Sequence, residues 1–182
     1  MNVRLFELFT SVEGEGILAG TKTLFVRFAG CPFTCFYCDT KEALPLDSGE
    51  QYSIEDACKL INDKLELKTF KVNFTGGEPL IQDEALTELA KFVQEKGFQT
   101  YLESSCFDSK KFARVLPFIN YVKIEFKTRD SEFIDDQHYD TLKQNALECL
   151  KISVSANKIT YIKVVISART GLKPIAELLD EI

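Results

Sequence analysis

Three cysteines place the strongest constraint on what this chain can fold into. Cys31, Cys35 and Cys38 form a C-x3-C-x2-C triplet in a Gly- and Pro-containing loop directly after the apolar run 24–29. Thiolates at this spacing can converge on one soft metal centre, because zinc and iron–sulfur clusters prefer them as ligands. A closed zinc site needs a fourth protein ligand, and the only histidine, His138, is far away in the sequence. The triplet therefore favours a 4Fe-4S cluster with one open iron, with a zinc knuckle or a chance group of buried cysteines as the alternative.

The rest of the chain alternates between strand-like and helix-like stretches. Strands are expected at residues 4–9, 23–29, 70–74, 98–103, 121–126 and 159–166. Amphipathic helices are expected at residues 53–65, 83–96, 109–116, 138–150 and 173–182. Loops are expected at residues 10–16 and 42–52. This order predicts an α/β fold with a parallel sheet, of about five βα units after an N-terminal strand. A full eight-unit barrel takes about 250 residues, so we expect a partial, open (β/α) barrel.

Length and composition exclude several classes of protein. The chain of 182 residues fits a single domain that spans residues 1–182. No apolar run approaches the roughly 20 residues that cross a bilayer, and no signal peptide is evident, so a cytoplasmic protein without a membrane partner is expected. Six cysteines then indicate metal binding or free thiols rather than disulfides. The net charge of −6 argues against direct contact with nucleic acid and favours a small-molecule substrate.

A second motif lies at the same predicted edge of the sheet as the cysteine loop. Residues 75–79 read Thr-Gly-Gly-Glu-Pro and follow the expected strand 70–74, and α/β folds bind ligands at this edge. Glycine suits a backbone that a ligand must approach closely, although the turn alone could be a plain strand-to-helix connection. Together with the triplet and with Tyr37, the turn resembles the radical S-adenosylmethionine (SAM) superfamily. In that superfamily the open iron binds the amino and carboxylate groups of SAM.

The first third of the chain carries a more specific pattern. Residues 13–16 read Glu-Gly-Glu-Gly, residues 25–31 read Phe-Val-Arg-Phe-Ala-Gly-Cys, and residues 38–40 read Cys-Asp-Thr. Over about residues 6–40 and 75–80 the chain resembles the 7-carboxy-7-deazaguanine synthase family. The resemblance implies a radical SAM lyase that converts 6-carboxy-5,6,7,8-tetrahydropterin to 7-carboxy-7-deazaguanine, which feeds queuosine or archaeosine in tRNA. It also implies a 4Fe-4S cluster, SAM and Mg2+ as cofactors, a one-electron donor such as flavodoxin or ferredoxin, and a homodimer.

The resemblance also implies a role for individual residues. The cluster ligands would be Cys31, Cys35 and Cys38. The residues beside SAM would be Tyr37, Cys38, Asp39, Gly76, Gly77, Glu78, Glu125, Phe126 and Lys127. The pterin site would be lined by Val12, Glu13, Gly14, Arg27 and Thr75. Arg27 would meet the substrate carboxylate, which a guanidinium can grip with two hydrogen bonds, and the hydroxyl of Thr40 would bind Mg2+, a cation that keeps few protein ligands.

The sequence departs from the family pattern at several positions. Glu13 replaces a preferred Gln, so an amide donor becomes a carboxylate that only accepts hydrogen bonds. The family's E-T-N-G is Glu-Ser-Ser-Cys at residues 103–106, and its S-P-K is Glu-Phe-Lys at residues 125–127. The family also continues into a further strand and a tail, so the chain is expected to lack both, as a truncated or a naturally short relative.

Two other functions stay open. A glycyl-radical enzyme activase shares the cysteine triplet but acts on a protein, and it does not call for the Glu-Gly-Glu-Gly segment or for Thr40. A zinc- or thiol-rich module, or a metal-binding fragment without turnover, is the non-enzyme alternative. In that case Arg27 would face water from an edge strand, and Thr40 would only cap its loop.

Overall fold

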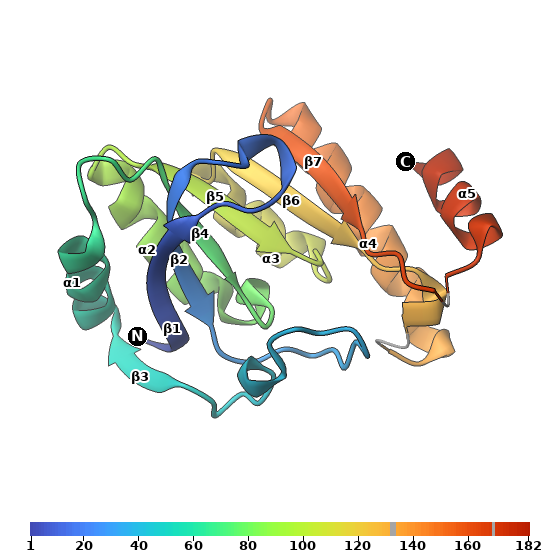
Figure 1. Cartoon of the computed structure of the whole chain (residues 1–182), viewed down its shortest axis with the longest axis horizontal. Coiled ribbons are helices and arrows are strands. Elements are labelled where there is room, and N and C mark those ends of the chain that lie inside the picture. The colour runs from blue at the N-terminus through green and yellow to red at the C-terminus, as the bar shows by residue number, and fades with distance from the viewer. Residues whose placement is uncertain (132–133, 169) are drawn as a thin grey trace.

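One seven-stranded sheet, in the order β3-β1-β2-β4-β5-β6-β7, runs through the molecule. The computed structural model describes residues 1–131, 134–168 and 170–182, and Figure 1 shows its elements. The strands are β1 (Asn2–Val12), β2 (Lys22–Phe28), β3 (Glu50–Ser53), β4 (Lys71–Gly76), β5 (Gln99–Ser104), β6 (Tyr121–Phe126) and β7 (Ile159–Val164). The helices are α1 (Ile54–Lys64), α2 (Asp83–Glu95), α3 (Ser109–Val115), α4 (Asp136–Ser155) and α5 (Leu172–Glu181).

The parallel part of the sheet forms an open barrel. Strands β2, β4, β5, β6 and β7 pair in parallel, while β1 pairs antiparallel with β2 and with β3. The outermost strands of the sheet order are β3 and β7, which do not pair with each other. The prediction of a partial, open (β/α) barrel is therefore confirmed.

The two faces of the sheet carry opposite kinds of side chain, because successive residues of a strand point to opposite faces. In β4, Val72 and Phe74 belong to the apolar core, whereas Lys71, Asn73 and Thr75 carry polar groups that bond across the other face. Helices α2, α3 and α4 cover the apolar face and lie behind the sheet in Figure 1. We call the opposite, polar face the concave face.

Local signals in the sequence set where the helices begin and end. The Ser53 hydroxyl accepts a hydrogen bond from the Asp56 amide at 3.1 Å, as expected for the cap of α1. Asp108 caps α3 in the same way. Gly97, with φ of +83°, follows α2 in the left-handed conformation that glycine adopts without strain.

Two boundary predictions were wrong. The expected loop 42–52 contains most of β3. In the expected loop 10–16, residues 10–12 belong to β1. Both segments are polar, and they become strands because they pair with distant partners. Val12 is paired with Lys22 of β2, and β3 is paired with the first residues of β1. The other expected strands and helices are present, with ends shifted by a few residues and α4 extended to Ser155.

Among residues 1–131, 134–168 and 170–182, no helix combines the length and the apolar character needed to cross a membrane.

Candidate active site at the carboxyl edge of the sheet

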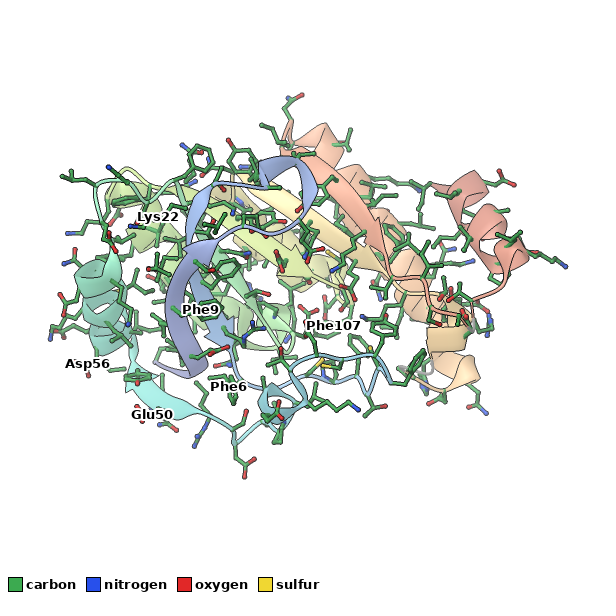
Figure 2. All side chains as sticks on the ribbon, in the orientation of Figure 1. Phe6, Phe9, Lys22, Glu50, Asp56 and Phe107 are labelled. Atoms are coloured by element: carbon green, nitrogen blue, oxygen red, sulfur yellow. The ribbon has the colours of Figure 1, made fainter. Side chains whose placement is uncertain are left out.

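The cysteine loop follows the end of β2 and is fixed by backbone hydrogen bonds. The amides of Gly30 and Cys31 donate to the carbonyls of Ala43 and Leu44, at 2.8 and 3.0 Å. Phe33 anchors the loop in an apolar cluster and meets Phe107 edge-on, with ring centroids 6.2 Å apart. Figure 2 shows Phe107 beside this loop. Backbone hydrogen bonds and the contacts of Phe33 therefore fix the conformation of the loop.

The three thiols of the triplet line one cavity of about 250 Å³. Burial raises the pKa of Cys31 to about 12. Burial also raises the pKa of Cys35, and the charge and hydrogen bond of Lys127 oppose that rise. Because thiolates are the ligating form, filling this cavity with iron must release protons.

The arrangement of the thiols bears on which metal they could hold. Within the described ranges, no three Cys, His, Asp or Glu side chains converge closely enough to hold a single metal ion. A closed zinc site needs four such ligands around one ion. The three thiols in the wall of the cavity are the donors that a 4Fe-4S cluster takes, and each sulfur would bind a different iron. The cavity therefore fits a 4Fe-4S cluster.

The Thr-Gly-Gly-Glu-Pro turn packs directly on the cysteine loop. A side chain at Gly77 would place its Cβ 2.1 Å from the Gly30 carbonyl oxygen, and one at Gly76 would lie 2.4 Å from the Phe28 backbone. Gly76 also has φ of +141°, which only glycine adopts readily. The two glycines are therefore required for the contact between the two loops. They line the cysteine cavity and an adjoining cavity of about 90 Å³.

The buried carboxylate of Glu78 is fully engaged by the protein. It accepts hydrogen bonds from the Leu80 amide, the Ser104 hydroxyl, and both the amide and the hydroxyl of Ser105, at 2.6–3.0 Å. The residue that follows, Cys106, has φ of +56° where the family pattern has glycine. Its buried backbone carbonyl accepts a contact from the Cys149 thiol at 3.7 Å. Glu78 thus ties the turn after β4 to the turn after β5.

The end of β6 lies beside the cysteine cavity. The Lys127 ammonium contacts the Glu125 carboxylate at 2.5 Å and lies 5.6 Å from the centre of the Tyr37 ring. Both members of this pair line the cavity, together with Cys38 and Asp39. Phe126, between them, points to the other face and joins the apolar core. Only the backbone of Phe126, and not its side chain, is therefore available at the concave face.

Of the residues expected around the pterin, Thr75 lines one of the two cavities, and Val12, Glu13, Gly14 and Arg27 line neither. Arg27 and Thr75 are register partners on β2 and β4, and the Arg27 Nε donates to Glu7 at 2.8 Å. Thr75 lines the 90 Å³ cavity. Val12 is 61% exposed, and Gly14 is exposed as well.

Glu13 is withdrawn from both cavities and buried in an ion pair. Its Oε2 lies 2.8 Å from the Lys71 ammonium, whose side chain is fully buried and also donates to the Thr23 hydroxyl. The departure from Gln at this position, just after β1, is thus matched by a lysine at the start of β4.

Thr40 lies at the rim of the cysteine loop. Its hydroxyl donates to the Asp39 carboxylate at 3.0 Å and makes no capping bond to the short helical turn that follows. The pair presents two oxygen donors of the kind that Mg2+ prefers. These residues therefore fit a cation held by few protein ligands.

Comparison with known proteins decides the family. Residues 12–157 match the family described as a 4Fe-4S single cluster domain. The 7-carboxy-7-deazaguanine synthase of Methanocaldococcus jannaschii is 34% identical over 93% of this chain and 73% of that protein. The chain belongs to the 7-carboxy-7-deazaguanine synthase family.

Another relative agrees with this membership, and a solved structure shares the fold. The synthase of Archaeoglobus fulgidus is 33% identical over 91% of this chain and 72% of its own length. The structure of QueE from Escherichia coli has a TM-score of 0.55 at 20% identity and covers 89% of this chain and 94% of that one. That structural likeness concerns the fold. A 4Fe-4S cluster and SAM are the cofactors of the family, and Cys31, Cys35 and Cys38 share one cavity.

Several side chains at the site were not singled out from the sequence. Glu103, Ser105 and Lys123 line the smaller cavity, and Lys163 lines the larger one. A charged residue in a strand reads as an edge or surface position, so its burial is not evident from the sequence alone. The polar and apolar residues of the central strands β4 and β6 alternate strictly. Such alternation identifies a polar face, but that face is ordinarily turned to water, so the sequence carries no signal that it is buried here.

Proposed function

We propose that this chain is a radical SAM lyase that converts 6-carboxy-5,6,7,8-tetrahydropterin to 7-carboxy-7-deazaguanine. The observation that carries the proposal is the shared cavity of the cysteine triplet and the Gly76–Gly77 turn, in a chain that belongs to the synthase family. When bound, the cluster and SAM supply the abstraction of a hydrogen atom from the substrate. The protein holds these groups, orients the pterin and excludes water.

The substrate would lie across the ends of β2, β4 and β5. Arg27 is anchored by its Nε to Glu7, so the two terminal nitrogens of the guanidinium can grip a carboxylate. Thr75 supplies a hydroxyl at the smaller cavity. The Thr40 hydroxyl and the Asp39 carboxylate would hold Mg2+ at the rim, where the cation would share oxygens with the substrate.

The remaining parts of the proposal concern the setting of the enzyme. The chain would act in the cytoplasm as a homodimer and take single electrons from a flavodoxin or a ferredoxin. Its product would feed the modification of tRNA toward queuosine or archaeosine, without contact between this chain and nucleic acid. A glycyl-radical activase is a weaker candidate, because the chain belongs to a family named for a small-molecule product.

The test is anaerobic reconstitution with iron and sulfide, followed by titration of the carboxy-tetrahydropterin and assay of 5′-deoxyadenosine and product. Arg27→Ala should weaken pterin binding by about 2–5 kcal/mol, the cost of leaving a carboxylate unpaired. Thr40→Ala should retain cluster and SAM binding but reduce the dependence on Mg2+. Arg114→Ala is the matched control and should bind pterin normally, because the half-exposed Arg114 of α3 pairs with Asp83 outside both cavities. Normal pterin binding by Arg27→Ala would contradict the proposed site.

A further inference from the structure

A buried pair of opposite charges lies at the smaller cavity. Glu103 of β5 and Lys123 of β6 are register partners, and both line the cavity beside Thr75. The Lys123 Nζ lies 2.9 Å from Glu103 Oε2, and the side chains are only 4% and 16% exposed. Glu103 matches the Glu of the family's E-T-N-G segment, and neither residue is assigned a role by the resemblance described above.

Neighbouring side chains fix both members of the pair. Glu103 also accepts hydrogen bonds from the Asn73 amide at 2.9 Å and the Thr75 hydroxyl at 3.1 Å. The Lys123 ammonium has a second carboxylate, Glu15, at 3.5 Å. A donor and an acceptor of protons are therefore held in one geometry at the wall of the cavity.

The other ionisable groups of this cavity are committed elsewhere. Glu78 accepts four hydrogen bonds from the backbone and from serine hydroxyls. Lys127 and Glu125 pair with each other beside the cysteine loop. Cys31 belongs to the cluster triplet. Glu103 and Lys123 are the pair that is bonded to Thr75, the residue proposed to contact the substrate.

The overall conversion calls for such an exchange. The deazaguanine product has the composition of the carboxy-tetrahydropterin minus one ammonia, so the conversion is redox-neutral and ends in an elimination. A carbon must lose a proton, and the departing nitrogen must gain one. General acid–base catalysis by positioned side chains typically contributes about 10²–10⁴-fold to such steps.

We propose that Glu103 and Lys123 are the base and the acid of this elimination, an inference that rests on the proposed function. The Glu103 carboxylate takes the proton from the carbon next to the C–N bond, and the C–H electrons form the new C=C bond. The C–N bond breaks with its electron pair on nitrogen, which takes a proton from Lys123 Nζ and leaves as ammonia. The protonated Glu103 then returns its proton to the neutral Lys123 amine across their 2.9 Å contact, which restores both charges.

The experiment separates the radical step from the elimination in the reconstituted enzyme. Lys123→Arg keeps a positive charge but holds its proton, and Glu103→Gln keeps an acceptor but cannot take a proton. Both variants should form 5′-deoxyadenosine from SAM and substrate within about three-fold of the wild type. Release of ammonia should fall by about 100-fold or more. Pterin affinity, measured without reductant, should stay within about three-fold of the wild type.

A matched control is Lys71→Arg, because Lys71 is an equally buried lysine of the concave face paired with a glutamate but lies outside the cavity. Its ratio of ammonia to 5′-deoxyadenosine should equal that of the wild type, even where its stability falls. If ammonia and 5′-deoxyadenosine fall in parallel in Lys123→Arg, or ammonia release is unchanged, the assignment is wrong while the proposed function stands. If the wild type forms neither product from the pterin, the proposed function fails and the assignment fails with it.

Discussion

The apolar face and the concave face are built by the same strands but are stabilised differently. On the apolar face, Phe74, Leu102 and Ile124 are fully buried against α2, α3 and α4, and non-directional burial holds them. On the concave face, the neighbouring residues Asn73 and Lys123 are also buried, and both bond to Glu103, which is 16% exposed. Buried side chains in this fold are therefore not always apolar. Burial of apolar surface stabilises the first face, whereas hydrogen bonds and ion pairs fix the positions of the side chains on the second.

The largest effect is expected at the cysteine loop, where a substitution should affect cofactor binding rather than the stability of the fold. Replacing Cys31, Cys35 or Cys38 by Ala should abolish the reconstituted cluster and SAM cleavage, because a ligand set of three cannot lose one. Thermal stability of the metal-free protein should change little, because the loop is fixed by its own backbone bonds. Iron content and visible absorbance measure the first effect. Cys58→Ala, in α1, is the control, and loss of iron from it would show that the ligands are misassigned.

The next largest effect is expected where charge is buried deepest. Lys71→Met leaves the Glu13 carboxylate buried without its cation, which should cost about 3–5 kcal/mol in the free energy of unfolding. Burial lowers the pKa of Lys71, and Glu13 opposes that shift, so the two charges depend on each other.

Replacing both charged residues of the pair by neutral ones should recover most of the lost free energy of unfolding. The double variant Glu13→Gln with Lys71→Met, measured by urea denaturation in a double-mutant cycle, should therefore be more stable than Lys71→Met alone. Additive losses in the cycle would mean that the pair is not coupled.

A smaller effect is expected for a conservative change on the apolar face. Ile124→Val removes one buried methylene next to Lys123 in sequence and should cost about 0.5–1.5 kcal/mol. Cluster content and 5′-deoxyadenosine formation should be unchanged, because Ile124 points to the helices. Denaturation and a turnover assay on the same sample give both values. Altered turnover would mean that the two faces are not independent.

The smallest effect concerns the half-exposed bridge between the β1–β2 loop and β7. Glu15 contacts Lys163 at 2.8 Å. Burial raises the pKa of Glu15, but the hydrogen bond and charge of Lys163 and the charge of Lys123 lower it by more. Glu15→Gln should cost less than about 1 kcal/mol near neutral pH.

The sign of the pH dependence follows from the lowered pKa. Stability from Glu15 is fully present above its ordinary pKa of 4.5 and is lost as pH falls through the lowered value. The difference in Tm between the wild type and Glu15→Gln should therefore narrow below about pH 4.5. A constant difference between pH 7 and pH 3 would exclude this bridge as its source.

The sequence predicted what depends on local pattern. Period-two and helical spacing predicted the parallel sheet and its helices, and the cysteine spacing predicted the shared cavity of the triplet. It missed β3, whose polar residues become a strand only by pairing with the start of β1. It also missed the partner of Glu13, because Lys71 lies 58 positions away and no local signal links the two residues.

The hydrogen bonds of Glu78 restrict which residues can replace Ser104 and Ser105 during evolution. Its carboxylate needs a side-chain donor at both position 104 and position 105. The family's Thr-Asn pair and the Ser-Ser pair found here differ in size and chemistry, yet each keeps one donor at each position. Exchange between the two pairs is thus a conservative event, whereas a single alanine at either position leaves a buried lone pair without a donor. While position 78 remains Glu, positions 104 and 105 should consequently each keep a side-chain donor, which gives a way to recognise remote relatives whose individual motifs have diverged.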